Sequence, residues 1–165
     1  MGIDYIIIAF LGLIAALFKN IFTEHGMIWR DSLLLPSWAP LGSVLGSLSG
    51  AVFILFVVAV ILLWKESRKN KRHVYPVELF GSGIYLIYVL AFMAVLDIFQ
   101  SYLFFMLHAL SLSLAVRISI VILGLTVSFA ALKLSRISSY FLLIYTGWMI
   151  FLSYMAYAII TLNAT

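Results

Sequence analysis

The chain has 165 residues, of which 65% are hydrophobic and only 10% are charged. Soluble domains carry about 45–50% apolar and about 25% charged residues. A domain of this size could not bury so much apolar surface, so the composition excludes an ordinary soluble fold. The net charge is +4, and much of the basic charge falls in one short loop, at Lys65, Arg68, Lys69, Lys71 and Arg72. A basic cluster beside apolar segments is typical of a membrane topology signal, and no nucleic-acid partner is expected.

Five apolar segments are long enough, at about 20 residues each, to cross the hydrocarbon layer of a bilayer. They lie at about residues 3–22, 44–64, 77–106, 112–132 and 139–162. A helix satisfies its own backbone hydrogen bonds in lipid, and the long continuous runs lack the alternation of a β-barrel. We therefore predict an all-α fold, a single domain over residues 1–165 formed by a bundle of five transmembrane helices. The first segment is predicted to be a retained span, because no basic residue precedes it.

The distribution of basic residues predicts the orientation of the bundle. The loop 65–76 and the turn 133–136 lie on the same side and hold all the basic residues except Lys19, Arg30 and Arg117. We expect this basic side, together with the N-terminus, to face the cytoplasm. In a prokaryote the membrane would be the plasma (inner) membrane.

The segment 23–43 links the first two spans and contains Trp38. Its sequence mixes polar and apolar residues and is not uniformly apolar. We predict that it caps one end of a cavity inside the membrane. Gly42, Gly46 and Gly50 follow at the start of the second span and share one helix face. Small residues at this spacing allow close helix packing in lipid, either within the chain or between two copies in a homodimer.

Asp97 lies well inside the third span. An ionisable group at this depth is costly and should face the bundle interior or a water-lined cavity. Ser101 and Phe104 follow on the same helix face, with Gln100 beside them. The pattern favours a polar patch in a ligand cavity, and the alternative is a structural hydrogen bond to a neighbouring helix. A proton relay is disfavoured, because the fourth and fifth spans offer no second acid or histidine at depth.

On the fifth span, one helix face carries Phe141, Tyr145, Trp148 and Leu152. Such an aromatic stripe is typical either of core packing or of a wall that contacts a flat ligand. The histidines are dispersed, there is no cysteine, and no pair of carboxylates accompanies them. We therefore predict no metal site, no bound cofactor and no catalytic residue, and the residues alone do not indicate an enzyme.

Three stretches of the sequence resemble the translocator protein family, also called tryptophan-rich sensory proteins or peripheral-type benzodiazepine receptors. The first is Trp29 followed by residues 36–40 (PSWAP), where the family has Pro-x-Trp-x-Pro-Pro. The second is residues 96–105 (LDIFQSYLFF), where the family has Leu-Asn-x-x-Trp-Ser-x-x-Phe-Phe. The third is residues 144–151 (IYTGWMIF), with the Leu-Asn pair at 162–163. In order and spacing the resemblance covers nearly the whole chain.

The resemblance implies a five-helix bundle whose cavity binds porphyrins such as protoporphyrin IX, and in some members sterols or benzodiazepine-type ligands. It also implies a homodimer. Some bacterial members degrade porphyrin in light, which is attributed to tryptophans on the second and fifth helices. This chain differs at the second-helix position, where Ser49 replaces the tryptophan, and Phe53 replaces the tyrosine that follows. Asp97 and Gln100 replace the third-helix Asn and Trp. No basic residue follows Tyr157, so sterol binding through the C-terminal recognition pattern is not expected.

These observations favour a membrane-embedded binder, sensor or carrier of a hydrophobic small molecule, with a porphyrin-type (tetrapyrrole) ligand as the first candidate. The predicted ligand-binding residues are Trp38, Ser49, Phe53, Asp97, Gln100, Ser101, Tyr145 and Trp148. In this hypothesis Trp38 acts as a lid, the other aromatic side chains stack on the ligand, and Asp97 with Gln100 fixes its orientation. The alternatives are a light-dependent porphyrin-degrading enzyme, a secondary transporter and a purely structural membrane protein.

Overall fold

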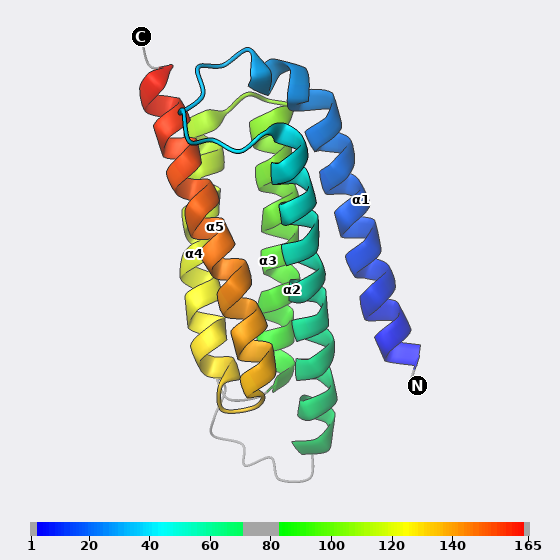
Figure 1. The fold of residues 1–165 in the computed structure, drawn as a ribbon. Helices are drawn as coiled ribbons and strands as arrows, with labels where there is room; N and C mark the ends of the chain where they lie inside the picture. Colours follow the sequence, from blue (N-terminus) through cyan, green and yellow to red (C-terminus); the bar gives the residue numbers. More distant parts are fainter. Residues whose placement is uncertain (1–2, 71–82, 164–165) are drawn as a thin grey trace.

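A computed structural model describes residues 3–70 and 83–163, and these residues form helices and short turns without any strand (Figure 1). The helices are α1 (Ile3–Asp31), α2 (Gly42–Asn70), α3 (Gly83–Phe105), α4 (Leu110–Ala131) and α5 (Arg136–Leu162). All five are long and apolar enough to cross a membrane. The predicted all-α bundle of five membrane-spanning helices is therefore confirmed. The predicted loop 65–76 is helical up to Asn70, because α2 continues through the polar residues after its apolar run. The rest of that loop, 71–76, and the predicted start of the third span at 77–82 lie outside the described residues.

Helices that follow one another in the chain run antiparallel, and their contacts define a closed arrangement (Figure 1). α1 packs against α2 and α3, α2 packs against α5, and α4 packs between α3 and α5. The loop 32–41, the turn 106–109 and the C-terminal end of α5 lie at one end of the bundle, which we call the 32–41 end. The N-terminal end of α1 lies at the opposite end.

The first helix is longer than the apolar run that predicted it, because α1 continues through the polar residues after residue 22 and ends at Asp31. Local bonds support this extension: the Thr23 hydroxyl donates to the carbonyl of Lys19 at 2.8 Å, and the Asn20 amide donates to Glu24 at 2.9 Å. Hydropathy marks where a helix leaves the apolar layer, whereas its end is set by the backbone. The predicted non-helical link 23–43 therefore shrinks to residues 32–41.

The closest helix contacts are made by glycines other than those of the predicted small-residue face. A Cβ atom added to Gly26 of α1 would lie 2.5 Å from the Cβ of Phe105 in α3, and one added to Gly124 of α4 would lie 2.5 Å from a side chain of α5. A Cβ atom on Gly46 or Gly50 would meet nothing within 4 Å. These two glycines of α2 therefore do not pack against another helix in the described part of the chain.

Side-chain contacts fix the 32–41 end of the bundle. The side-chain amide of Asn163 bonds both backbone groups of Leu34, with each donor and acceptor 3.0 Å apart. The Trp29 ring stacks on His108 with centroids 4.0 Å apart, and Trp38 stacks on Tyr154 of α5 at 5.2 Å. The loop 32–41 is thus attached to α5, and the turn 106–109 is attached to α1.

The bundle core is apolar and lies mainly between α2, α3, α4 and α5. Leu63, Leu90 and Met93 are fully buried there. α1 contributes little to this core, because its buried residues are only Ala15, Gly26 and Arg30. The first helix is therefore the least tightly held wall of the bundle.

A candidate ligand cavity with charged walls

A cavity of about 120 Å³ lies inside the bundle toward the 32–41 end. All five helices contribute to its wall. The residues that line it are Ala16, Lys19, Asn20, Thr23, Met27, Arg30, Gly42, Leu45, Gly46, Ser49, Gly50, Phe53, Asp97, Gln100, Ser101, Phe104, Phe105, Arg117, Leu152 and Met155. The wall is unusual for a membrane bundle because it combines apolar residues with three basic residues and one acid.

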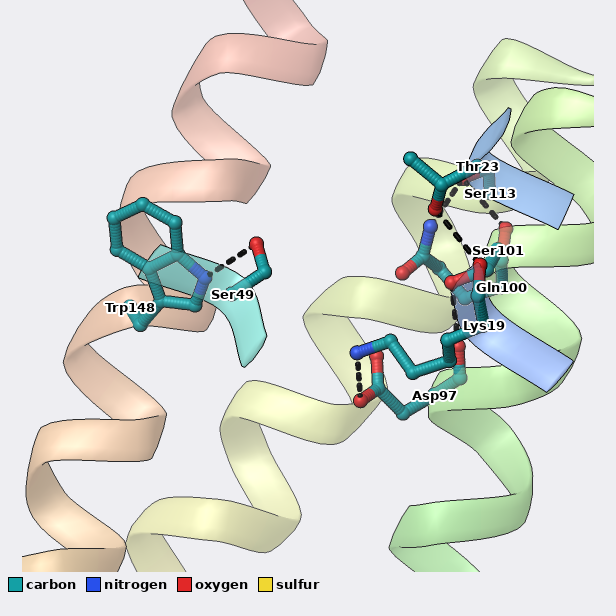
Figure 2. A network of polar contacts seen from close by, with 8 residues as sticks. All are labelled: Lys19, Thr23, Ser49, Asp97, Gln100, Ser101, Ser113 and Trp148. Atoms are coloured by element: carbon teal, nitrogen blue, oxygen red, sulfur yellow. Dashed lines mark hydrogen bonds and ion pairs between the residues drawn. The ribbon is translucent and has the colours of Figure 1, made fainter. Parts of the chain in front are cut away.

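The acid in this wall, Asp97, forms an ion pair with α1. The Lys19 Nζ atom lies 2.6 Å from Asp97 Oδ2 (Figure 2). The Asp97 side chain is 1% exposed and the Lys19 side chain is 20% exposed. The Ser101 hydroxyl donates to the backbone carbonyl of Asp97 at 3.0 Å. A charge at this depth needs an opposite charge nearby, so the pair ties the loosely held α1 to α3.

Arg117 of α4 is a second buried charge beside the pair, and only 5% of this residue is exposed. Its Nη1 atom donates to the backbone carbonyl of Leu152 at 2.9 Å, and its guanidinium lies 5.4 Å from the centre of the Phe104 ring. Its Nε atom has no hydrogen-bond partner in the described part of the chain. The hydroxyl of Tyr145 is also buried and has no hydrogen-bond partner among the described residues.

Gln100 extends the polar wall toward α4. Its Nε2 atom lies 3.4 Å from the hydroxyl of Ser113, and that hydroxyl lies 3.4 Å from the backbone carbonyl of Gln100 (Figure 2). Both residues are buried. These long bonds hold the Gln100 amide against α4, at the edge of the cavity.

Arg30 closes the cavity at the 32–41 end. The Arg30 residue is 2% exposed, and its guanidinium donates to the backbone carbonyl of Pro40 at 3.2 Å and to Asp31 at 3.1 Å. Met27 and Gly42 complete this closure, since a Cβ on Gly42 would lie 2.9 Å from the sulfur of Met27. The closing residues belong to the segment 23–43 that was predicted as a cap, but Met27, Arg30 and Gly42 are all helical.

The structure brings together five of the residues predicted to bind ligand. Ser49, Phe53, Asp97, Gln100 and Ser101 all line the cavity. Their direct contact with a ligand stays a prediction, because the structure contains none.

The other three predicted residues lie behind or beside this wall. Tyr145 is buried and packs on Phe56 at 4.7 Å. Trp38 is 43% exposed and packs on α5. Trp148 lies beside α2, where its Nε1 atom donates to the Ser49 hydroxyl at 3.2 Å (Figure 2). The resemblance implies tryptophans at positions 49 and 148. In this chain the two positions are in contact, although position 49 holds serine.

Sequence reasoning missed the basic residues of the wall. All three, Lys19, Arg30 and Arg117, were assigned to the side opposite the basic loops, with Lys19 at the end of the first span. The structure corrects this, because none of the three lies in a loop. For Arg117 the signal was present: it is flanked by apolar residues on both sides, as Asp97 is. The rule that an ionisable residue within a span needs a partner applies equally to both.

One comparison places the chain among known proteins. A sequence profile of the TspO/MBR family matches residues 6–162, which is nearly the whole chain. Among curated proteins, no match to this chain was found. Within the described residues, no three His, Cys, Asp or Glu side chains gather as metal ligands would.

Proposed function

The chain belongs to the TspO/MBR family, and on this basis we propose that it binds or carries a hydrophobic small molecule within the bilayer. Its five long apolar helices make it an integral multi-pass membrane protein. The observation that carries the proposal is the polar cavity around Asp97, walled by all five helices. Ligand sites in helix bundles form between facing helices and combine apolar walls with a few placed polar groups.

A purely structural role explains this cavity poorly. Burying polar groups without partners costs stability, yet Arg30 and Arg117 both carry a buried Nε atom without a partner among the described residues. A buried polar atom without a partner calls for an explanation, and a bound polar ligand would supply one. The residues proposed to bind ligand are the wall residues Ser49, Phe53, Asp97, Gln100 and Ser101, with Trp38, Tyr145 and Trp148 as outer contacts.

A porphyrin is the first ligand to test, because the family resemblance implies it. The cavity of about 120 Å³ is smaller than the roughly 300–1,000 Å³ typical of ligand sites. A rigid macrocycle would therefore enter only if α1 moved away from α2 and α3. The small buried surface of α1 supports such a movement.

The orientation proposed for the bundle places the basic end in the cytoplasm. The basic residues that do not belong to the basic end, Lys19, Arg30 and Arg117, lie in helices and line the cavity. The loops 32–41 and 106–109 at the opposite end contain no lysine or arginine. The rule counts basic residues in short loops, and the contrast between the two sides is therefore sharper than the raw sequence suggested. The proposal puts a prokaryotic protein in the inner membrane.

A homodimer is proposed because the family resemblance implies one, and because Gly46 and Gly50 of α2 are exposed where they border the cavity. Gly46 and Gly50 meet no atom of the described chain within 4 Å of an added Cβ, and small residues at this spacing promote helix association in lipid. Analytical ultracentrifugation of the purified protein tests this, with Gly46→Leu expected to shift the population toward monomer. An unchanged dimer fraction in that variant would place the interface elsewhere.

The proposed function is tested by titrating protoporphyrin IX and related porphyrins into the purified protein and following tryptophan fluorescence. Saturable quenching is expected for the wild type, and altered affinity for Asp97→Asn because this residue lines the cavity. Trp148→Phe removes the indole donor to Ser49 while keeping an aromatic ring. If the wild type binds and both variants bind equally well, the site lies elsewhere. If neither a porphyrin nor any other hydrophobic ligand binds, the proposed function falls.

A further inference from the structure

A second cavity lies next to the charged one, toward the N-terminal half of α1. Its volume is about 430 Å³, and its wall consists only of apolar residues and one glycine from α1, α2 and α3. Leu11 and Val95 line it and are 59% and 61% exposed. Because a bilayer would surround these exposed residues, the apolar cavity is accessible from the lipid.

Phe53 of α2 lines both cavities. The Phe53 residue is 4% exposed, and the Lys19 Nζ atom lies 5.1 Å from the centre of its ring. The ring therefore stands between a charged compartment and an apolar compartment.

The charged compartment has more positive than negative charge. Three cations, Lys19, Arg30 and Arg117, line it. Asp97 pairs with Lys19, and Asp31 pairs with Arg30. Arg117 forms no ion pair within 4.0 Å among the described residues, and its Nε atom has no hydrogen-bond partner there. A buried cation is costly unless an anion approaches it, and the fork of a guanidinium suits a carboxylate. The compartment thus lacks one anion.

We propose that the two cavities form one bipartite site for an ionised long-chain fatty acid that enters from the bilayer. Its carboxylate binds between Arg117 and Lys19, and its single hydrocarbon chain occupies the apolar cavity beyond Phe53. This proposal rests on the proposed function, since it specifies the ligand class of that same site. The charge of the small compartment selects the head group, and the shape and apolar wall of the larger one select the chain.

The ion pair predicts the direction in which one substitution changes the affinity for a fatty acid. Asp97 holds Lys19 at 2.6 Å, and it is itself a carboxylate that competes with the head group of the ligand. Asp97→Asn frees Lys19 and removes a repelling negative charge. This variant should therefore bind a fatty acid more tightly than the wild type does. If Asp97 instead anchored the ligand through a hydrogen bond, the same variant would bind more weakly.

The test uses the full chain in nanodiscs of zwitterionic phosphatidylcholine at mildly alkaline pH, where the free acid is ionised. Binding of radiolabelled palmitate is measured against empty nanodiscs and is competed with hexadecanol or butyrate. Hexadecanol keeps the chain without the carboxylate, and butyrate keeps the carboxylate without the chain. We expect saturable palmitate binding, with each analogue at least about tenfold weaker.

Variants test the two halves of the site separately. Arg117→Gln should weaken palmitate binding at least about tenfold while leaving hexadecanol unchanged. Ala94→Phe fills the apolar cavity, which Ala94 lines, and should weaken palmitate and hexadecanol alike. Ala51→Phe is the matched control, because Ala51 is exposed on α2 and lines neither cavity. If Arg117→Gln does not fold, Asp97→Asn and Ala94→Phe decide the question.

Three results would overturn the inference: no saturable palmitate binding, equal affinity for hexadecanol, or weaker palmitate binding in a folded Asp97→Asn variant. A parallel titration with protoporphyrin IX in the same nanodiscs separates this inference from the proposed function. Porphyrin binding without palmitate binding refutes the fatty-acid site and leaves the proposed function intact. If neither ligand binds, and no other hydrophobic ligand does, both proposals fail.

Discussion

Removing one partner of the Lys19–Asp97 pair should destabilise the bundle more than any exposed ion pair does. At 2.6 Å and an effective dielectric constant of about 20, the attraction is roughly 6 kcal/mol before the cost of desolvation. Breaking a buried pair typically costs about 3–5 kcal/mol, because the remaining charge stays buried. Lys19 is 20% exposed, so we expect the lower end of this range, about 3 kcal/mol, for Lys19→Met.

The assay is a double-mutant cycle with Lys19→Met, Asp97→Asn and the double variant. The free energy of unfolding is measured by reversible SDS titration in mixed micelles, followed by the helical circular dichroism signal. The double variant should lose less stability than the sum of the single losses, with a coupling energy of about 2 kcal/mol. Lys69→Met is the control. It breaks the exposed pair with Glu66, whose atoms are 3.0 Å apart, and should change stability by less than about 1 kcal/mol.

Additive losses would refute this reasoning. If the double variant equals the sum of the single variants to within about 0.5 kcal/mol, the two side chains do not depend on one another in the membrane. Asp97 would then be satisfied by other groups, and α1 would be held by its apolar contacts alone.

Three further predictions concern the closure of the bundle. Gly26→Ala should destabilise the bundle by about 1–3 kcal/mol, because the new Cβ would lie 2.8 Å from a backbone oxygen of α3. In the same SDS titration, Gly46→Ala should change the free energy of unfolding by less than about 0.5 kcal/mol. Asn163→Ala removes both bonds to the loop 32–41, at about 1 kcal/mol each, and hydrogen exchange should rise in that loop while the helices keep their protection. Arg30→Gln removes the guanidinium bond to the same loop and should speed its cleavage by added protease; an unchanged cleavage rate would contradict the anchoring role.

Much of the fold could be predicted from the sequence, because lipid imposes a simple rule on the backbone. A segment of about 20 apolar residues must become a helix when no water is present to satisfy its peptide groups. The five runs therefore predicted five helices, and the third of them placed Asp97 in the bundle interior. Hydropathy did not predict where α1 ends, because polar residues beyond the apolar layer continue the helix to Asp31.

The sequence by itself determined the membrane class, the helix number and the acid that had to find a partner. Only the tertiary structure decided which partner that acid has, because Lys19 and Asp97 are 78 positions apart in the chain. It also decided that the glycines in closest contact are Gly26 and Gly124, since helix spacing along one chain does not reveal which face meets a neighbour. The excess of positive charge in the cavity was set in the same way, by helices that bring distant cations to one wall.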